Sequence, residues 1–220
     1  MSLPTEIRKK YLLLCEGADC EYFLINYFLF LEKQGSPQFQ DKIQLINFGG
    51  NSQLSETLKL IKMMRNFSNV RSLLIVRDAE KDAPAALQSV QNTLKSSSLP
   101  IPIKPGEWGE KGGIKAAYLL FPTCQEEIHE GTLEDLCVDI LKHESESCQD
   151  INLIIDWMYK LENEYGKEWK WPHKTRLNLY FSINNKYVGM KLGEAAKAHA
   201  FNWDSPLLQN LKSCIEQGFN

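Results

Sequence analysis

The sequence predicts an α/β fold, in which a mainly parallel sheet is flanked by helices. Three short segments, residues 11–15, 43–48 and 72–76, are predicted to be strands, and each precedes a predicted helix. The first of them is an apolar run without polar alternation, which is typical of a buried parallel strand. The alternation of strands and helices favours a parallel sheet, because each parallel connection needs a crossover that a helix can supply. The 220 residues, 43% hydrophobic and 24% charged, are enough for one large domain or one domain with a small appendage.

The first two strand and helix pairs are bounded by turn and cap residues. The strand over 11–15 ends at a Glu-Gly pair, and Asp19 is expected to cap a helix over 20–33. The strand over 43–48 ends at a Gly-Gly-Asn turn, after which Ser52 is expected to cap the next helix.

The third pair and the segment that follows it complete the sheet. The most hydrophobic strand, 72–76, leads through an acidic turn to a helix that has Pro84 in its first turn and ends near Ser96. Residues 96–113 are rich in serine, proline and glycine and are expected to form a loop. A fourth strand is predicted over 115–121.

The last part of the chain is predicted to be helical. A helix is expected after Gly131 and Thr132, and the α/β domain is expected to span residues 1–143. A polar hinge at 144–147 then begins a helical C-terminal extension, 144–220, packed on that domain. Its predicted helices cover 149–165, 174–182, 191–197 and 205–217.

Composition restricts the classes of function. The charge balance is close to neutral, 25 basic against 28 acidic residues, and the pI near 5.9 argues against broad, unselective wrapping of nucleic acid. The six cysteines contain no CxxC pair, so we expect free, mostly buried thiols and no zinc site. The longest apolar run, 22–31, is too short to cross a membrane, and the first residues have no signal-peptide pattern, so a cytoplasmic protein is expected.

Acidic residues and glycines follow the predicted strands. In a parallel sheet the ligand crevice lies beyond the carboxyl ends of the strands. The residues at this edge are Glu16 and Gly17 after the first strand, Gly49, Gly50 and Asn51 after the second, and Asp78, Glu80 and Asp82 after the third. If the backbone stays extended, Asp78 and Glu80 leave the same face and can hold Mg²⁺ or Mn²⁺ through carboxylate oxygens. Glu16 is then a further ligand or a general acid/base, and the glycines let a phosphate approach the backbone.

This order of motifs carries a family resemblance. Glu-Gly, then Gly-Gly-Asn, then Asp-x-Glu at successive strand ends resembles the Toprim domain shared by topoisomerases, primases, OLD nucleases and recombination-repair proteins. More narrowly, segments 15–19 (CEGAD), 131–136 (GTLEDL) and 201–204 (FNWD) are similar to the Toprim-like DUF3226 family, over nearly the whole chain. The resemblance implies that Glu16 is the family glutamate and that Asp78 and Glu80 are the metal-binding pair. That pair is usually Asp-x-Asp, so Asp82 is an alternative to the longer Glu80.

Each candidate residue also has a simpler interpretation. Glu16 can be a solvated loop carboxylate and Asp82 a cap of the following helix. Glu134 is a candidate supporting ligand, although an acid in the first turn of a helix also favours the helix dipole. The segment 167–176 interleaves lysine, arginine and histidine with Trp169 and Trp171, which is typical of a nucleic-acid contact and also of a solvated surface.

The function expected from these observations is that of a Mg²⁺- or Mn²⁺-dependent, nuclease-like hydrolase acting on the phosphodiesters of DNA or RNA. The alternatives are a catalytically inactive module that binds a metal, a nucleotide or a protein partner, and a metal-dependent phosphotransferase acting on a small metabolite. No membrane partner is expected. Protein partners and the oligomeric state are left open by the sequence.

Overall fold

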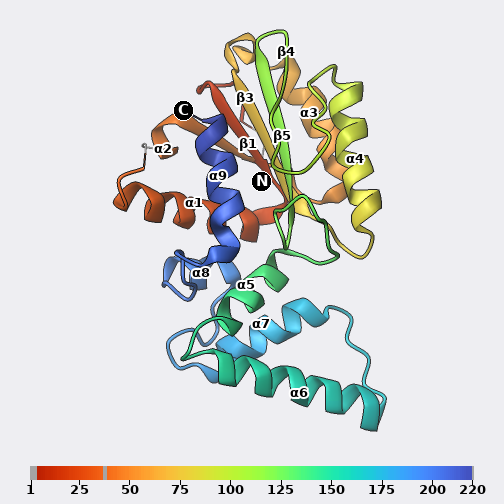
Figure 1. Ribbon diagram of the computed structural model, residues 1–220, viewed down its shortest axis with the longest axis vertical. Coiled ribbons are helices and arrows are strands. Elements are labelled where there is room, and N and C mark those ends of the chain that lie inside the picture. Colours follow the sequence, from red (N-terminus) through yellow and green to blue (C-terminus); the bar gives the residue numbers. More distant parts are fainter. Residues whose placement is uncertain (1–3, 37–38, 220) are drawn as a thin grey trace.

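The computed structural model describes residues 4–36 and 39–219 (Figure 1). One five-stranded sheet lies at its centre, in the order β2-β1-β3-β5-β4. The strands are β1 (Tyr11–Cys15), β2 (Ile43–Asn47), β3 (Ser72–Asp78), β4 (Gly109–Lys111) and β5 (Ile114–Phe121). The first four strands of this order are parallel to one another, and only β4 runs antiparallel, against β5. The mainly parallel α/β sheet predicted from the sequence is therefore confirmed.

Helices surround this sheet and continue beyond one end of it. They are α1 (Gly17–Lys33), α2 (Phe39–Lys42), α3 (Leu54–Met63), α4 (Ala83–Ser96), α5 (Leu133–Lys142), α6 (Cys148–Tyr165), α7 (Pro172–Ile183), α8 (Leu192–Lys197) and α9 (Gln209–Gly218). Short 3₁₀ turns cover Asn51–Gln53, Phe67–Asn69 and Pro206–Leu208. Figure 1 shows α3 and α4 on one face of the sheet, α1 and α9 on the other, and α5, α6 and α7 extending below the strand ends.

The two faces of the sheet are buried in separate apolar cores. Leu12 and Leu14 of β1 pack with α3 and α4, whereas Leu13 and Cys15 pack with α1, α5 and α9. All four side chains have no exposed surface. Burial on both faces explains why β1 is a continuous apolar run, and each buried leucine stabilises the fold by roughly 1.5–3 kcal/mol.

The C-terminal helices share the core of the α1 face. Helix α9 packs on β3 and β5, and α8 packs on α1 so closely that a Cβ at Gly193 would come within 2.6 Å of Tyr22. The indole of Trp203 lies 5.0 Å from the ring of Phe23 and 5.7 Å from that of Tyr27. Helices α6 and α7 pack on α5 and on each other, and their buried residues belong to the same core.

Three local expectations were wrong. Asp19 is not the cap of α1, because Gly17 adopts φ +79° and turns the chain into the helix directly after β1, with Glu16 in the cap position. Ser52 does not cap α3; a 3₁₀ turn that contains it comes first, and Gln53 occupies the cap position. The expected loop at 96–113 contains β4, a short polar strand paired with β5.

The cysteines form no disulfide in the described residues, and five of the six are buried, which confirms the expected free thiols. In the same residues, every helix is too short or too polar to cross a membrane.

Candidate metal site at the strand ends

The strand order places the end of β1 beside the end of β3. From β1 the chain passes over one face through α1 to β2, and from β2 it returns over the opposite face through α3 to β3. From β3 the chain continues on that second face through α4 to β5, on the far side from β2. The connections that leave β1 and β3 therefore run in opposite directions, which is where open α/β sheets form their ligand crevices. Glu16 and Asp78 lie at this point, and the backbone N–H of Asp78 donates to Oε2 of Glu16 at 3.4 Å.

The carboxylate of Asp78 is held at the N-terminus of α5. Its Oδ1 accepts a hydrogen bond of 2.9 Å from the backbone N–H of Leu133. Burial, and then the neighbouring carboxylates of Glu16, Glu134 and Glu80, raise the pKa of Asp78 well above its usual range, although the Leu133 bond opposes this shift. Asp78 is therefore the focus of an electrostatically crowded acidic cluster.

Glu134 belongs to this cluster and forms an ion pair with a lysine. Its side chain is only 10% exposed, and its Oε1 lies 3.3 Å from Nζ of Lys174 in α7. Burial disfavours the charged lysine, but Glu134, Asp19 and Asp78 together raise the pKa of Lys174 above its usual value. Lys174 is thus a cation that α7 places beside the acidic cluster.

A buried arginine lies beneath Glu16. Arg77 has no exposed surface, its Nε lies 3.6 Å from Oε2 of Glu16, and the same Nε donates to the backbone oxygen of Asp78 at 3.1 Å. Its two terminal nitrogens are buried and have no hydrogen-bond partner among the described residues. The carboxylate of Glu16 therefore faces a buried positive charge.

Glu80 and Asp82 depart from the extended arrangement considered in the sequence. Glu80 has φ +59°, and its backbone exchanges two hydrogen bonds of 2.8 Å with Gly131, so the strand geometry ends before this residue. Glu80 is exposed and is the weakest of the carboxylates that raise the pKa of Asp78. Asp82 is the cap of α4, where its Oδ1 accepts from the N–H of Ala85 at 2.9 Å.

The glycine turns border a neighbouring cavity of about 540 Å³, lined by Gly17, Gly49, Asn47, Gln53 and others. Gly49 needs its positive φ of +82°, and a Cβ there would come within 2.2 Å of the Gln53 side chain. The N–H of Gly49 donates to Oδ1 of Asn47 at 2.8 Å. Gly50 and Asn51 follow in the turn, and Asn51 begins the 3₁₀ turn before α3.

The carboxylates at the strand ends do not form a closed metal cage. In the described part of the chain, no three His, Cys, Asp or Glu side chains are placed to hold one ion together. Mg²⁺, however, commonly binds one or two carboxylates together with water and substrate phosphate, without a closed protein cage. Asp78 with Glu16 or Glu134 offers such oxygens, and their mutual repulsion at Asp78 is what a divalent cation would relieve.

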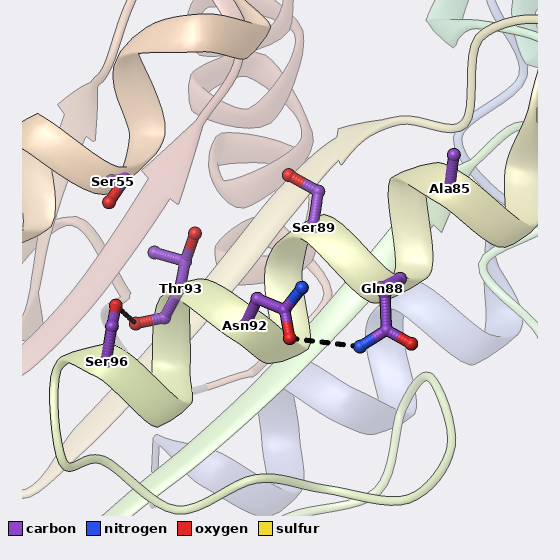
Figure 2. A pocket seen from close by; sticks show the side chains of 7 residues that line it. All are labelled: Ser55, Ala85, Gln88, Ser89, Asn92, Thr93 and Ser96. Carbon is purple, nitrogen blue, oxygen red and sulfur yellow. Dashed lines mark hydrogen bonds between the residues drawn. The ribbon is translucent and has the colours of Figure 1, made fainter.

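A separate hollow of about 550 Å³ lies between α3 and α4 (Figure 2). It is lined by small and neutral polar side chains: Ser55, Ala85, Gln88, Ser89, Asn92, Thr93 and Ser96. Some of these bond to one another, as Gln88 does to Asn92 at 3.0 Å. Because no ionisable side chain lines this hollow, it offers hydrogen bonds but no charge, and the acidic strand ends remain the stronger site.

Sequence reasoning missed Arg77, Lys174 and Asp19 as members of this site. The signal for Arg77 was a charged residue directly before Asp78 at the end of a buried strand. Lys174 had no such signal, because only the docking of α7 on α5 brings it to Glu134.

The fold and the site define an α/β protein with an acidic cluster between β1 and β3, where the connections of its parallel sheet diverge. The chain belongs to the family described as "Protein of unknown function (DUF3226)", whose model matches residues 10–220. This confirms the resemblance of the chain to that family. Neither a curated protein nor a solved structure matches the chain.

Proposed function

We propose that this chain is a Toprim-like, Mg²⁺- or Mn²⁺-dependent hydrolase that cleaves nucleic-acid phosphodiesters. The observation that carries the proposal is the burial of Asp78 among the carboxylates of Glu16, Glu134 and Glu80, at the ligand crevice of a parallel sheet. Burial first, and then these carboxylates, raise the pKa of Asp78. Crowded carboxylates of this kind favour a divalent cation. Bound there, the ion would polarise a phosphoryl oxygen and lower the pKa of a bound water.

The residues of the chain have separate roles in this proposal. Asp78 would hold the ion with Glu134, and Glu80 would add a ligand from the rim. The Leu133 N–H orients Asp78 for this role. Glu16, paired with Arg77, would take the proton of the attacking water or share the ion. Lys174 would face the substrate phosphate, and the turn at Gly49, Gly50 and Asn51 would leave space for the chain of the substrate.

A second candidate is a binding module without catalytic activity. It is favoured by one observation: the carboxylates at the site already have protein partners, namely the Leu133 N–H for Asp78, Arg77 for Glu16 and Lys174 for Glu134. Such a site would hold a metal or a nucleotide and would leave phosphodiesters intact.

The deciding experiment is calorimetric titration of Mg²⁺ and Mn²⁺, with single-stranded and duplex DNA and RNA incubated in parallel. We expect the wild type to bind metal and to cleave nucleic acid, and Glu16→Gln to lose cleavage. Glu162→Gln, on the exposed side of α6, is the matched control and should retain both properties. Binding without cleavage would favour the binding module. Absence of metal binding with nucleic acid present would exclude the hydrolase and a module that binds metal.

A further inference from the structure

A small cavity of about 210 Å³ lies next to the acidic cluster, between the turn after β3, the start of α5 and the start of α7. We call it the Trp171 pocket. The lining residues that matter here are Glu80, Lys81, Lys170, Trp171, His173 and Arg176. The pocket therefore joins a proposed metal ligand, Glu80, to the basic and aromatic segment 167–176. Its volume is below the roughly 300–1,000 Å³ of pockets that enclose a whole small-molecule ligand, so it can hold only part of a larger one.

The pocket has an aromatic wall that a flat ring can reach. Trp171 is 52% exposed although it borders the cavity. The Lys170 ammonium lies 5.6 Å from the centroid of the Trp171 indole, and the His173 ring lies 6.3 Å from it, edge to face. An exposed indole beside a lysine ammonium is an arrangement on which nucleobases stack in proteins that bind single strands.

Two ion pairs hold this wall against the acidic cluster. Nη1 of Arg176 lies 3.6 Å from Oδ1 of Asp135, and Lys174 pairs with Glu134, so adjacent acids in the first turn of α5 anchor α7. Asp135 also accepts from the N–H of Thr132 at 2.9 Å and from its hydroxyl at 3.1 Å. Trp171, directly before α7, is therefore fixed relative to the first turn of α5, where Asp78 is held.

The cations of the rim are placed for phosphates. Lys81 and Lys170 are exposed on the two sides of the pocket, one after β3 and one before α7. Glu80 and Glu130 are the acids of the pocket besides Asp135, and a divalent ion bound through Glu80 would offset part of their charge. A strand whose phosphates contact Lys81 or Lys170 would then continue toward Asp78 and Lys174.

We propose that the Trp171 pocket binds one unpaired base of a single-stranded nucleic acid, stacked on Trp171, with the adjacent phosphates on Lys81 and Lys170. The inference rests on the proposed function for what happens further along the strand, but the binding itself does not require metal or cleavage. Duplexes are excluded from the pocket, because their bases are stacked on each other and present no free face to the indole.

The test is fluorescence anisotropy with labelled oligothymidylate and oligouridylate of about 12 nucleotides, within the ~4–16 nucleotide sites of single-strand-binding folds. The full chain is used in EDTA at low salt. We expect saturable binding to at least one oligonucleotide and much weaker binding to the duplex. Trp171→Leu should weaken single-strand binding roughly 5- to 100-fold, while Trp171→Phe should restore most of the affinity.

Matched variants distinguish the contribution of this pocket from that of similar side chains on α6. Trp157→Leu removes another half-exposed indole, on α6, and should leave affinity unchanged. Lys170→Ala should lower the slope of log K against log salt by about 0.7, whereas Lys160→Ala should not change it. Unchanged affinity in Trp171→Leu, no saturable binding by the wild type, or equal binding of duplex would each overturn the inference.

The outcomes also separate the inference from the proposed function. If metal titration and cleavage fail while Trp171→Leu still weakens binding, the pocket stands and the hydrolase proposal falls. If single strands are cleaved but Trp171→Leu binds them as tightly as the wild type, the hydrolase proposal stands and the pocket falls.

Discussion

The ammonium of Lys174 lies 3.3 Å from the carboxylate of Glu134 and so links α7 to the first turn of α5. Asp19 and Asp78 act on the same ammonium. The ammonium of α7 is therefore placed among carboxylates that come from β3, α1 and α5. It partly neutralises the position that a divalent ion would take, so lysine and metal compete electrostatically.

Removing this competing charge should tighten metal binding. In Lys174→Met we expect the affinity for Mg²⁺ to rise about tenfold, because removing a unit charge within ~5 Å of a divalent ion is worth about 1–2 kcal/mol in a water-like dielectric. Calorimetry measures the change, with Lys160→Met on the exposed surface of α6 as the control. Weaker binding in Lys174→Met would contradict the competition.

Asp78→Asn should stabilise the metal-free protein at neutral pH. The raised pKa means that folding favours protonated Asp78, so its contribution to stability is fully present below the unfolded pKa near 3.8 and is lost as the pH rises through the folded value. The amide can still accept from Leu133 but carries no charge. We expect Tm at pH 7 to rise by about 2–4 °C, as for a gain of ~1 kcal/mol, and the gain to shrink toward pH 4.

Two comparisons complete this test. Asp156→Asn, an exposed acid on α6, should leave Tm unchanged at both pH values. Adding Mg²⁺ should raise Tm of the wild type and not that of Asp78→Asn, since only a ligand that binds the folded state stabilises it. A lower Tm for Asp78→Asn at pH 7 would mean that the carboxylate is stabilising as it stands.

Glu16 and Arg77 should be coupled in stability. Glu16→Gln leaves a fully buried guanidinium without its nearest carboxylate, and breaking a buried pair costs about 3 kcal/mol. Adding Arg77→Met removes the uncompensated charge, so the double variant should regain much of the loss. Urea unfolding of the wild type, both single variants and the double variant gives the coupling energy, and strictly additive effects would show that the two side chains act independently.

Glu80 and Asp82 can be separated as metal ligands. Glu80→Asp should leave metal affinity unchanged or raise it, because aspartate keeps the carboxylate and tolerates the left-handed backbone at this position. Asp82→Ala should cost about 1 kcal/mol through the lost cap of α4 but leave metal affinity unchanged. Calorimetry and urea unfolding on both variants distinguish the roles, and loss of metal affinity in Asp82→Ala would reverse them.

Most of the sheet was predictable because local sequence patterns indicate its strands and the helices that connect them. Strands β1 and β3 are buried on both faces and are therefore rich in apolar residues along their length. Helices α1 and α3, which lie between them in the sequence, carry apolar residues at helical spacing. Strand β4 was missed because its three residues, Gly109–Lys111, are polar and lie at the sheet edge, where burial imposes no pattern.

Only the site residues that directly follow or end a strand were predictable from the sequence. Glu16 and Asp78 could be placed at one edge from strand direction alone, because parallel strands end at the same edge. The conformation of Glu80 depends on its pairing with Gly131, and the arrival of Lys174 and Trp171 depends on how α7 docks on α5. Both depend on contacts between segments that are distant in the sequence, and local sequence patterns do not predict such contacts.

The shortness of β4 has a consequence for the protein in concentrated solution. Beyond β5, a long and flat apolar edge would offer unpaired backbone groups to a second molecule. Instead β4 presents only three residues, among them the exposed and oppositely charged Glu110 and Lys111. This side of the sheet is therefore a poor template for intermolecular strand pairing, and β4 protects the molecule against aggregation through its edge.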